Sequence, residues 1–143
     1  MNDPETEFRR ERGVLDTNAV ILMGRLSDPA CLPRYPAITT ITLAELSVGP
    51  LVARDDAERA ARQAHLQQAE ADFEPLPFDA GAARAFGRVA NDLRRAGRKR
   101  GARAYDALIA AVAIDRNLPL YTANPDDFTG IDELDVVTIP VPE

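Results

Sequence analysis

The chain has 143 residues, which is enough for one domain with a single core and too few for two. Hydrophobic residues make up 45% and charged residues 28%, a composition typical of a globular protein rather than of a disordered tail, and no apolar run reaches the roughly 18 to 20 residues needed to cross a bilayer. The formal net charge of −6 argues at first sight against a nucleic-acid partner.

The chain begins with a polar and charged segment over 1–12. It lacks the apolar stretch of a secretory signal, so the sequence indicates a cytoplasmic protein without a membrane anchor. We expect this segment to be a flexible N-terminal extension. A single folded domain is then predicted over 13–143.

The first elements of this domain are short. Residues 14–15 are apolar and predict a strand that ends at an aspartate, after which Thr17 can cap a helix reaching residue 22. The segment 28–36 contains several prolines and is expected to be a loop. It leads to residues 37–41, which are mostly β-branched and predict a second strand.

Three helices are predicted in the middle of the chain. The first opens at a capping box that begins with Thr42 and stops at the Gly49–Pro50 pair. The second covers 55–73, and its thin alanine stripe suits either a partner-facing helix or an ordinary exposed one. An extended segment follows, and Asp79 then caps a third helix that stops at Gly97.

The last third supplies one more helix and two strands. The helix ends near Asn117, a residue type that tolerates the left-handed conformation, and it is expected to bury one face made of Tyr105, Leu108, Ile109 and Val112. The strands cover 118–122 and 135–139. Apolar strands separated by helices predict an α/β fold, a three-layer α/β/α domain with a central and mainly parallel sheet.

Several acids fall where such a sheet places ligand sites, at the carboxyl ends of strands. Each also has a local explanation. Asp16 and Asp106 can favour the starts of helices, Glu45 completes the capping box, and Asp126 and Asp127 suit a turn. These explanations compete with a shared site, because the fold brings three of the positions toward one edge of the sheet.

The chemistry of a shared site is limited by the residues available. Cys31 and His65 are the sole members of their types, which excludes a disulfide framework, a cysteine zinc cluster and catalysis by a Ser-His-Asp or Cys-His set. Two carboxylates about 4 Å apart repel by roughly 4 kcal/mol at an effective dielectric near 20. A cluster of them therefore needs a cation, and oxygen ligands alone favour Mg²⁺ or Mn²⁺ and phosphoryl chemistry.

Four motifs occur in an order that is similar to a known family. They are Leu15–Asn18 with the sequence LDTN, Ile41–Leu46 with ITLAEL, Tyr105–Ala111 with YDALIAA, and Thr122–Phe128 with TANPDDF. Each is weak alone, but their order and separations resemble the signature of PIN-domain ribonucleases, and of VapC toxins in particular. The resemblance extends from about Gly13 to Pro140.

The resemblance implies an acidic pocket that holds one or two Mg²⁺ or Mn²⁺ ions and hydrolyses RNA by a metal-activated water. Transferred to this sequence, Asp16 and Asp106 are the expected direct ligands, Glu45 the third acid and Asp127 the fourth, with neighbouring Asp126 left open as an alternative. Thr122 and Asn124 are expected to support these acids by hydrogen bonds. A VapB-type antitoxin and assembly into a homodimer or larger complex are also implied.

Basic residues are concentrated in one segment that contains no acid, made of Arg94, Arg95, Arg98, Lys99, Arg100 and Arg103. A basic segment beside an acidic site suggests contact with the RNA backbone, assigned here to Arg98, Lys99 and Arg100, although a solvated surface explains the charges equally well. The functional alternatives are a non-toxin PIN-like nuclease, another phosphoryl hydrolase with an acidic site, and a phosphoreceiver module. Asn18 disfavours a phosphatase, which needs a second acid at that place.

Overall fold

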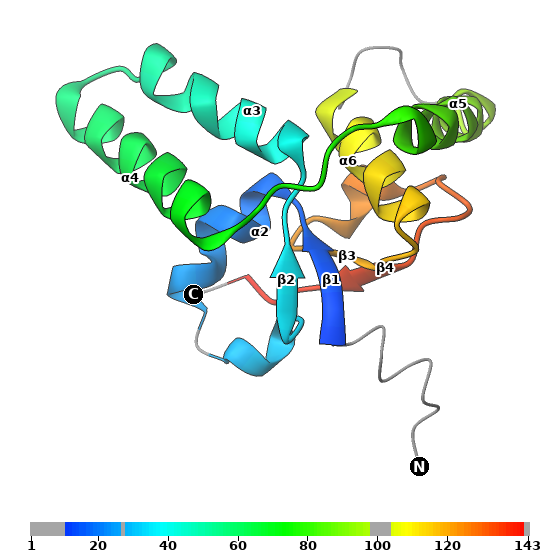
Figure 1. Ribbon diagram of the computed structural model, residues 1–143, viewed down its shortest axis with the longest axis horizontal. Coiled ribbons are helices and arrows are strands. Elements are labelled where there is room, and N and C mark those ends of the chain that lie inside the picture. Colours follow the sequence, from blue (N-terminus) through cyan, green and yellow to red (C-terminus); the bar gives the residue numbers. More distant parts are fainter. Residues whose placement is uncertain (1–10, 27, 98–103, 142–143) are drawn as a thin grey trace.

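The computed structural model describes residues 11–26, 28–97 and 104–141, and its elements alternate between strands and helices along the chain (Figure 1). The strands are β1 (Arg12–Leu15), β2 (Tyr35–Ala37), β3 (Leu120–Thr122) and β4 (Val136–Thr138). The α-helices are α2 (Thr17–Leu22), α3 (Thr40–Val48), α4 (Asp56–Asp72), α5 (Ala80–Arg95) and α6 (Ala104–Asp115). Short 3₁₀ helices are η1 (Met23–Arg25), η2 (Pro29–Cys31), η3 (Gly49–Val52) and η4 (Pro125–Phe128).

The strands of the described residues form one parallel sheet in the order β2-β1-β3-β4. Strand β1 lies in the interior, with Val14 opposite Ala37 on one side and Leu120 on the other. Beyond β2, Leu76 continues the pairing by donating its N–H to the carbonyl of Ile38 at 2.9 Å. The parallel strands bring their carboxyl ends to one edge, as the sequence predicted.

Helices cover both faces of the sheet, which confirms the three-layer α/β/α prediction. Successive strand residues point to opposite faces, so Val14 joins a core formed with α5 and α6, whereas Leu15 joins a core formed with α2, α3 and α4. Both side chains are fully buried. Figure 1 shows α3 and α4 side by side on one side of the sheet, and α5 and α6 together on the other.

Two helix starts differ from the sequence predictions. Helix α2 is capped by Asp16 rather than Thr17, because Asp16 Oδ1 accepts the N–H of Ala19 at 2.8 Å. Helix α3 is capped by Thr39, whose Oγ1 accepts the N–H of Thr42 at 3.2 Å, so the predicted capping box at Thr42 is wrong. Glu45 thereby has no capping role and lies in the second turn of α3.

The caps of α4 and α5 are those expected for helices that begin after an aspartate. Asp55 accepts the N–H of Glu58, which confirms the start of α4, and Asp79 accepts the N–H of Ala82, as predicted for α5. Asn117 adopts the predicted left-handed conformation, with φ of 54°. Helix α4 packs against α3 and η3, and its Ala69, which is 1% exposed, joins the core on that side of the sheet.

Two further boundaries and the burial of one residue differ from the sequence predictions. Strand β1 already includes Arg12, which the sequence placed in the N-terminal extension; residues 1–10 lie outside the described part. Strand β2 covers Tyr35–Ala37 and so begins inside the segment expected to be a loop. Tyr105 is 52% exposed and is not part of the buried face of α6. Among the described helices, none is long and apolar enough to span a membrane.

Candidate active site at the carboxyl edge of the sheet

Asp16 and Thr122 lie at the carboxyl ends of the neighbouring strands β1 and β3. Asp16 is 3% exposed and Thr122 is fully buried. Thr122 Oγ1 donates to Asp16 Oδ2 at 2.5 Å and accepts the backbone N–H of Asn124 at 3.0 Å. Because Oδ1 accepts the N–H of Ala19, each oxygen of Asp16 already has one hydrogen bond. Asn124 thus acts on this cluster through its backbone.

The environment of Asp16 resists ionisation of its carboxyl group. Burial is the main cause that raises the pKa of Asp16 above 3.8. The hydrogen bonds from Thr122 and Ala19 act in the opposite direction and lower that pKa, while the negative charge of Asp127 raises it. A carboxylate buried beside another negative charge is stabilised by a cation placed between them.

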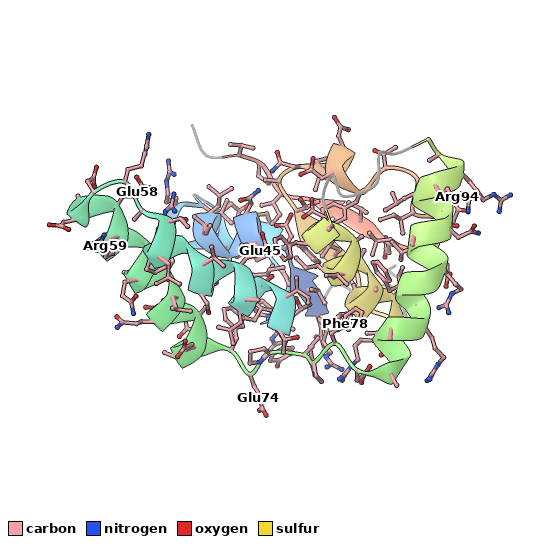
Figure 2. All side chains as sticks on the ribbon, turned by 90° about the horizontal axis from the view of Figure 1, so that it is seen from above. Glu45, Glu58, Arg59, Glu74, Phe78 and Arg94 are labelled. Atoms are coloured by element: carbon pink, nitrogen blue, oxygen red, sulfur yellow. The ribbon has the colours of Figure 1, made fainter. Side chains whose placement is uncertain are left out.

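Glu45 approaches the same region from α3, where it is half-buried. Thr17 Oγ1 donates to Glu45 Oε1 at 2.7 Å and lies 3.1 Å from Thr42 Oγ1. Burial raises the pKa of Glu45, the bond from Thr17 lowers it, and the charge of Asp16 raises it. In Figure 2, Glu45 lies in the middle of the molecule, far from the labelled Arg59 at the outer end of α4.

The other two predicted acids lie on elements that surround these residues. Asp127 is half-buried in η4, and its charge acts on Asp16, whereas Asp126 is exposed and is not among the groups that shift the pKa of Asp16. Asp106 is half-buried in the first turn of α6. Helix α6 packs against both η4 and α3, so Asp106 lies on the element between those of Asp127 and Glu45.

The acids do not form a closed metal cage. Within the described ranges, no three side chains of the types that ligate metals are gathered closely enough to enclose an ion. The donors nevertheless fit a hard divalent cation: all are carboxylate oxygens, and each ionised carboxylate has about four acceptor positions, so the bonded oxygens of Asp16 can still accept a metal. The charge of Asp127 raises the pKa of Asp16, the charge of Asp16 raises the pKa of Glu45, and a cation would relieve both effects.

Thr17 and Thr42 are parts of this site that the sequence did not assign to it. Thr17 was interpreted as a helix cap, and its position directly after Asp16 was the available signal, since residues adjacent to a strand-end acid lie at the same sheet edge. The predicted RNA-contacting residues Arg98, Lys99 and Arg100 lie outside the described residues.

The site consists of an aspartate at a strand end and further acids from the surrounding helices, on a parallel sheet covered on both faces. This arrangement agrees with the family that the sequence resembles. The PIN-domain family model matches residues 13–134. The chain belongs to the PIN-domain family.

Comparison with individual proteins places the chain among the VapC members of that family. It is 45% identical over 122 residues to ribonuclease VapC5 of Mycobacterium tuberculosis, with 84% of this chain and 87% of that protein covered. It is 31% identical over 131 residues to ribonuclease VapC of Rickettsia bellii, with 90% of this chain and 96% of that protein covered.

Solved structures agree with these relatives. A chain of the VapBC-5 crystal structure from Mycobacterium tuberculosis, a member of the VapBC family of toxin–antitoxin systems, superposes with a TM-score of 0.78 at 40% identity, covering 90% of this chain and 99% of that one. A chain of VapBC2 from Rickettsia felis, bound to a DNA fragment from its promoter, gives 0.71 at 25% identity, with 90% and 98% covered.

Proposed function

We propose that this protein is a Mg²⁺-dependent endoribonuclease and the toxin of a type II toxin–antitoxin pair. The observation that carries the proposal is the buried Asp16 carboxylate at the end of β1, held by Thr122 and made harder to ionise by burial and by Asp127. Family membership supplies the reaction class, since the relatives are named ribonucleases.

The acids have separate tasks in this proposal. Asp16 and Asp106 would hold Mg²⁺, with Mn²⁺ as a substitute, and Glu45 and Asp127 would complete the set of ligands. The cation supplies charge neutralisation at the attacked phosphate and lowers the pKa of a bound water. Glu45 or Asp127 would orient that water for in-line attack on the phosphate.

The basic segment is proposed to contact RNA phosphates through Arg98, Lys99 and Arg100. The described residues on either side of the segment support this assignment. Ala96, two residues before Arg98, lies so close to Gly130 that a Cβ built on the glycine would be 2.9 Å from the Ala96 Cβ, and Gly130 follows three residues after Asp127. On the other side, α6 begins at Ala104 and carries Asp106 in its first turn. The described residues on both sides of Arg98–Arg100 thus lie near acids of the site, Asp127 on one side and Asp106 on the other.

Substitution of single acids tests the reaction. Asp16→Asn and Asp106→Asn should each abolish Mg²⁺-dependent cleavage of a structured RNA mixture while circular dichroism remains that of the folded protein. Asp56→Asn is the matched control, because Asp56 is exposed and pairs with Arg59, which Figure 2 shows at the outer end of α4, away from Glu45. It should cleave at the wild-type rate. Wild-type cleavage by either purified site variant would end the assignment.

The RNA contact has its own experiment, a salt titration of RNA binding by the triple variant Arg98→Gln, Lys99→Gln, Arg100→Gln. Loss of three phosphate contacts should reduce the slope of log K against log salt by about 2, at roughly 0.7 per contact on single strands. Arg54→Gln with Arg59→Gln, around the start of α4, is the control and should leave the slope unchanged. An unchanged slope in the triple variant would leave those residues as solvated surface.

The proposed partner is a VapB-type antitoxin, bound in a dimeric or larger toxin–antitoxin assembly. The solved structures most relevant to this proposal are VapBC complexes, two of them with DNA. Co-expression with a VapB-type antitoxin, followed by size-exclusion chromatography with light scattering, should give one complex containing both proteins. Adding that antitoxin should suppress RNA cleavage. Separate elution of the two chains would contradict the proposed partnership.

A further inference from the structure

Thr17 connects two acids of the proposed site without being an acid itself. It follows Asp16 directly in the chain and is the first residue of α2. Its hydroxyl lies 2.7 Å from Glu45 Oε1 and 3.1 Å from Thr42 Oγ1, both on α3. One side chain on α2 therefore contacts the helix that presents Glu45.

The number of protons fixes the direction of these hydrogen bonds. A hydroxyl has a single proton, and an ionised carboxylate only accepts. If Thr17 donates to Glu45, the proton shared between the two threonines must come from Thr42. Thr42 is fully buried, and β-branched side chains have few available rotamers. The proton count therefore sets the direction from Thr42 through Thr17 to an ionised Glu45, and burial keeps the Thr42 side chain in place.

This arrangement treats the two carboxylate oxygens of Glu45 differently. Oε1 is held by Thr17, whereas among the described residues no donor forms a hydrogen bond with Oε2. We propose that Thr17 is a positioning residue whose hydroxyl fixes the orientation of Glu45 by holding Oε1 and reserves Oε2 for a divalent cation or its water. This inference rests on the proposed nuclease function.

Removal of the hydroxyl tests the inference with little change of shape. Thr17→Val should lower kcat for RNA cleavage by 10- to 100-fold, the usual effect of removing a hydrogen-bond partner of a metal-binding side chain, with little change in KM. It should also weaken Mn²⁺ binding at least several-fold, measured without RNA by electron paramagnetic resonance of the free ion. Thr17→Ser keeps the hydroxyl and should restore both quantities to within about threefold of wild type.

One control and one alternative variant separate a positioning role of Thr17 from an effect on folding. Thr40→Val removes another half-buried threonine hydroxyl of α3, which accepts the N–H of Phe78 at 3.3 Å. The substitution costs stability because the N–H of Phe78 loses its acceptor, yet kcat and Mn²⁺ affinity should stay at wild-type values. Should Thr17→Val fail to fold, Thr42→Val tests the same inference, because it leaves Thr17 in place without its own donor; a smaller loss of kcat and Mn²⁺ affinity is expected.

The decisive measurement is a double-mutant cycle on Mn²⁺ affinity. In a Glu45→Ala background, Thr17→Val should cost less than twofold, because the group that it positions is gone. An equal loss in both backgrounds, wild-type behaviour of Thr17→Val, or failure of Thr17→Ser to restore function would each overturn the inference. If the wild-type protein cleaves no RNA, the proposed function fails. The Mn²⁺ affinities of the variants still test whether Thr17 positions Glu45 for metal binding.

Discussion

The hydrogen bond between Thr122 and Asp16 joins two strands at the proposed site, and Thr122→Val removes it while preserving the side-chain shape. The substitution breaks the 2.5 Å bond to Asp16 Oδ2 and leaves the N–H of Asn124 without its acceptor at 3.0 Å. A hydrogen bond to a charged group contributes about 1.5 to 3 kcal/mol and a neutral one about 1 kcal/mol. We therefore expect unfolding to become easier by about 2 to 4 kcal/mol at neutral pH.

The loss should depend on pH in a direction that the pKa of Asp16 determines. The pKa of Asp16 is raised in the folded protein. The protonated carboxyl group therefore stabilises the fold fully below pH 3.8, and this stabilisation is lost as the pH rises through the pKa of the folded state. The bond from Thr122 lowers the pKa, so its removal raises the pKa further and adds a penalty only where Asp16 is ionised. The difference in stability between wild type and variant should therefore be largest at neutral pH and narrow toward pH 4.

Urea unfolding followed by circular dichroism, in the presence of EDTA and at several pH values, measures this difference. Thr138→Val is the matched control, because Thr138 ends the neighbouring strand β4 and is exposed. It should change stability by less than about 0.5 kcal/mol at every pH. A loss for Thr122→Val that is the same at pH 4.5 and pH 7.5 would show that the bond does not favour the charged form of Asp16.

Three more outcomes can be measured by urea unfolding and by RNA cleavage. In EDTA at pH 7, Asp16→Asn should unfold at higher urea than wild type, because it removes a buried charge and asparagine still caps α2; this advantage should shrink as the pH falls. Mg²⁺ at about 100 times its Kd should stabilise wild type by about 2.7 kcal/mol and Asp16→Asn far less. Thr39→Ala and Asp55→Ala should each cost about 1 kcal/mol through a lost helix cap, but only Thr39→Ala, at the start of the helix that carries Glu45, should slow cleavage.

The order of elements and the parallel sheet could be predicted because their signals are local. Short apolar runs separated by helices with a clear start and stop are sufficient to indicate strands buried on both faces. The starts of α4 and α5, after Asp55 and Asp79, were predicted well. At the starts of α2 and α3, where two candidate caps lay close together, the sequence pattern selected the wrong one.

Contacts distant in sequence decided both of those cases. The N–H of Asp16 donates to the carbonyl of Tyr121, so the ladder of β1 continues to Asp16 and the helix starts just after it. Leu76 accepts the N–H of Thr40 and donates to Ile38, which fixes the chain up to Thr40 as an extended segment. Helix α3 therefore begins there, and the capping box at Thr42 does not form. Neither strand β3 nor the extended segment at Leu76 could be identified as a partner from the residues at the helix start.

In the candidate site too, features set by local sequence could be predicted, and contacts between distant residues could not. That acids would follow strand ends was predictable from their positions, but the hydrogen bond from Thr17 to Glu45 depends on how α2 packs against α3, which no spacing in the sequence encodes. Tyr105 was expected to be buried because it keeps the spacing of its neighbours on α6. It lies in the first turn of that helix, where the exposed Ala104 marks the end of the packed surface.

The local and functional interpretations of Asp16 also proved compatible. Capping uses Oδ1 for the N–H of Ala19, and the link to β3 uses Oδ2 for the hydroxyl of Thr122. These bonds fix the orientation of a carboxylate that burial and Asp127 would otherwise make difficult to ionise. A cap at the first turn of α2 therefore holds the carboxylate in the orientation that a cation requires, and removal of either bond should weaken metal binding before it unfolds the chain.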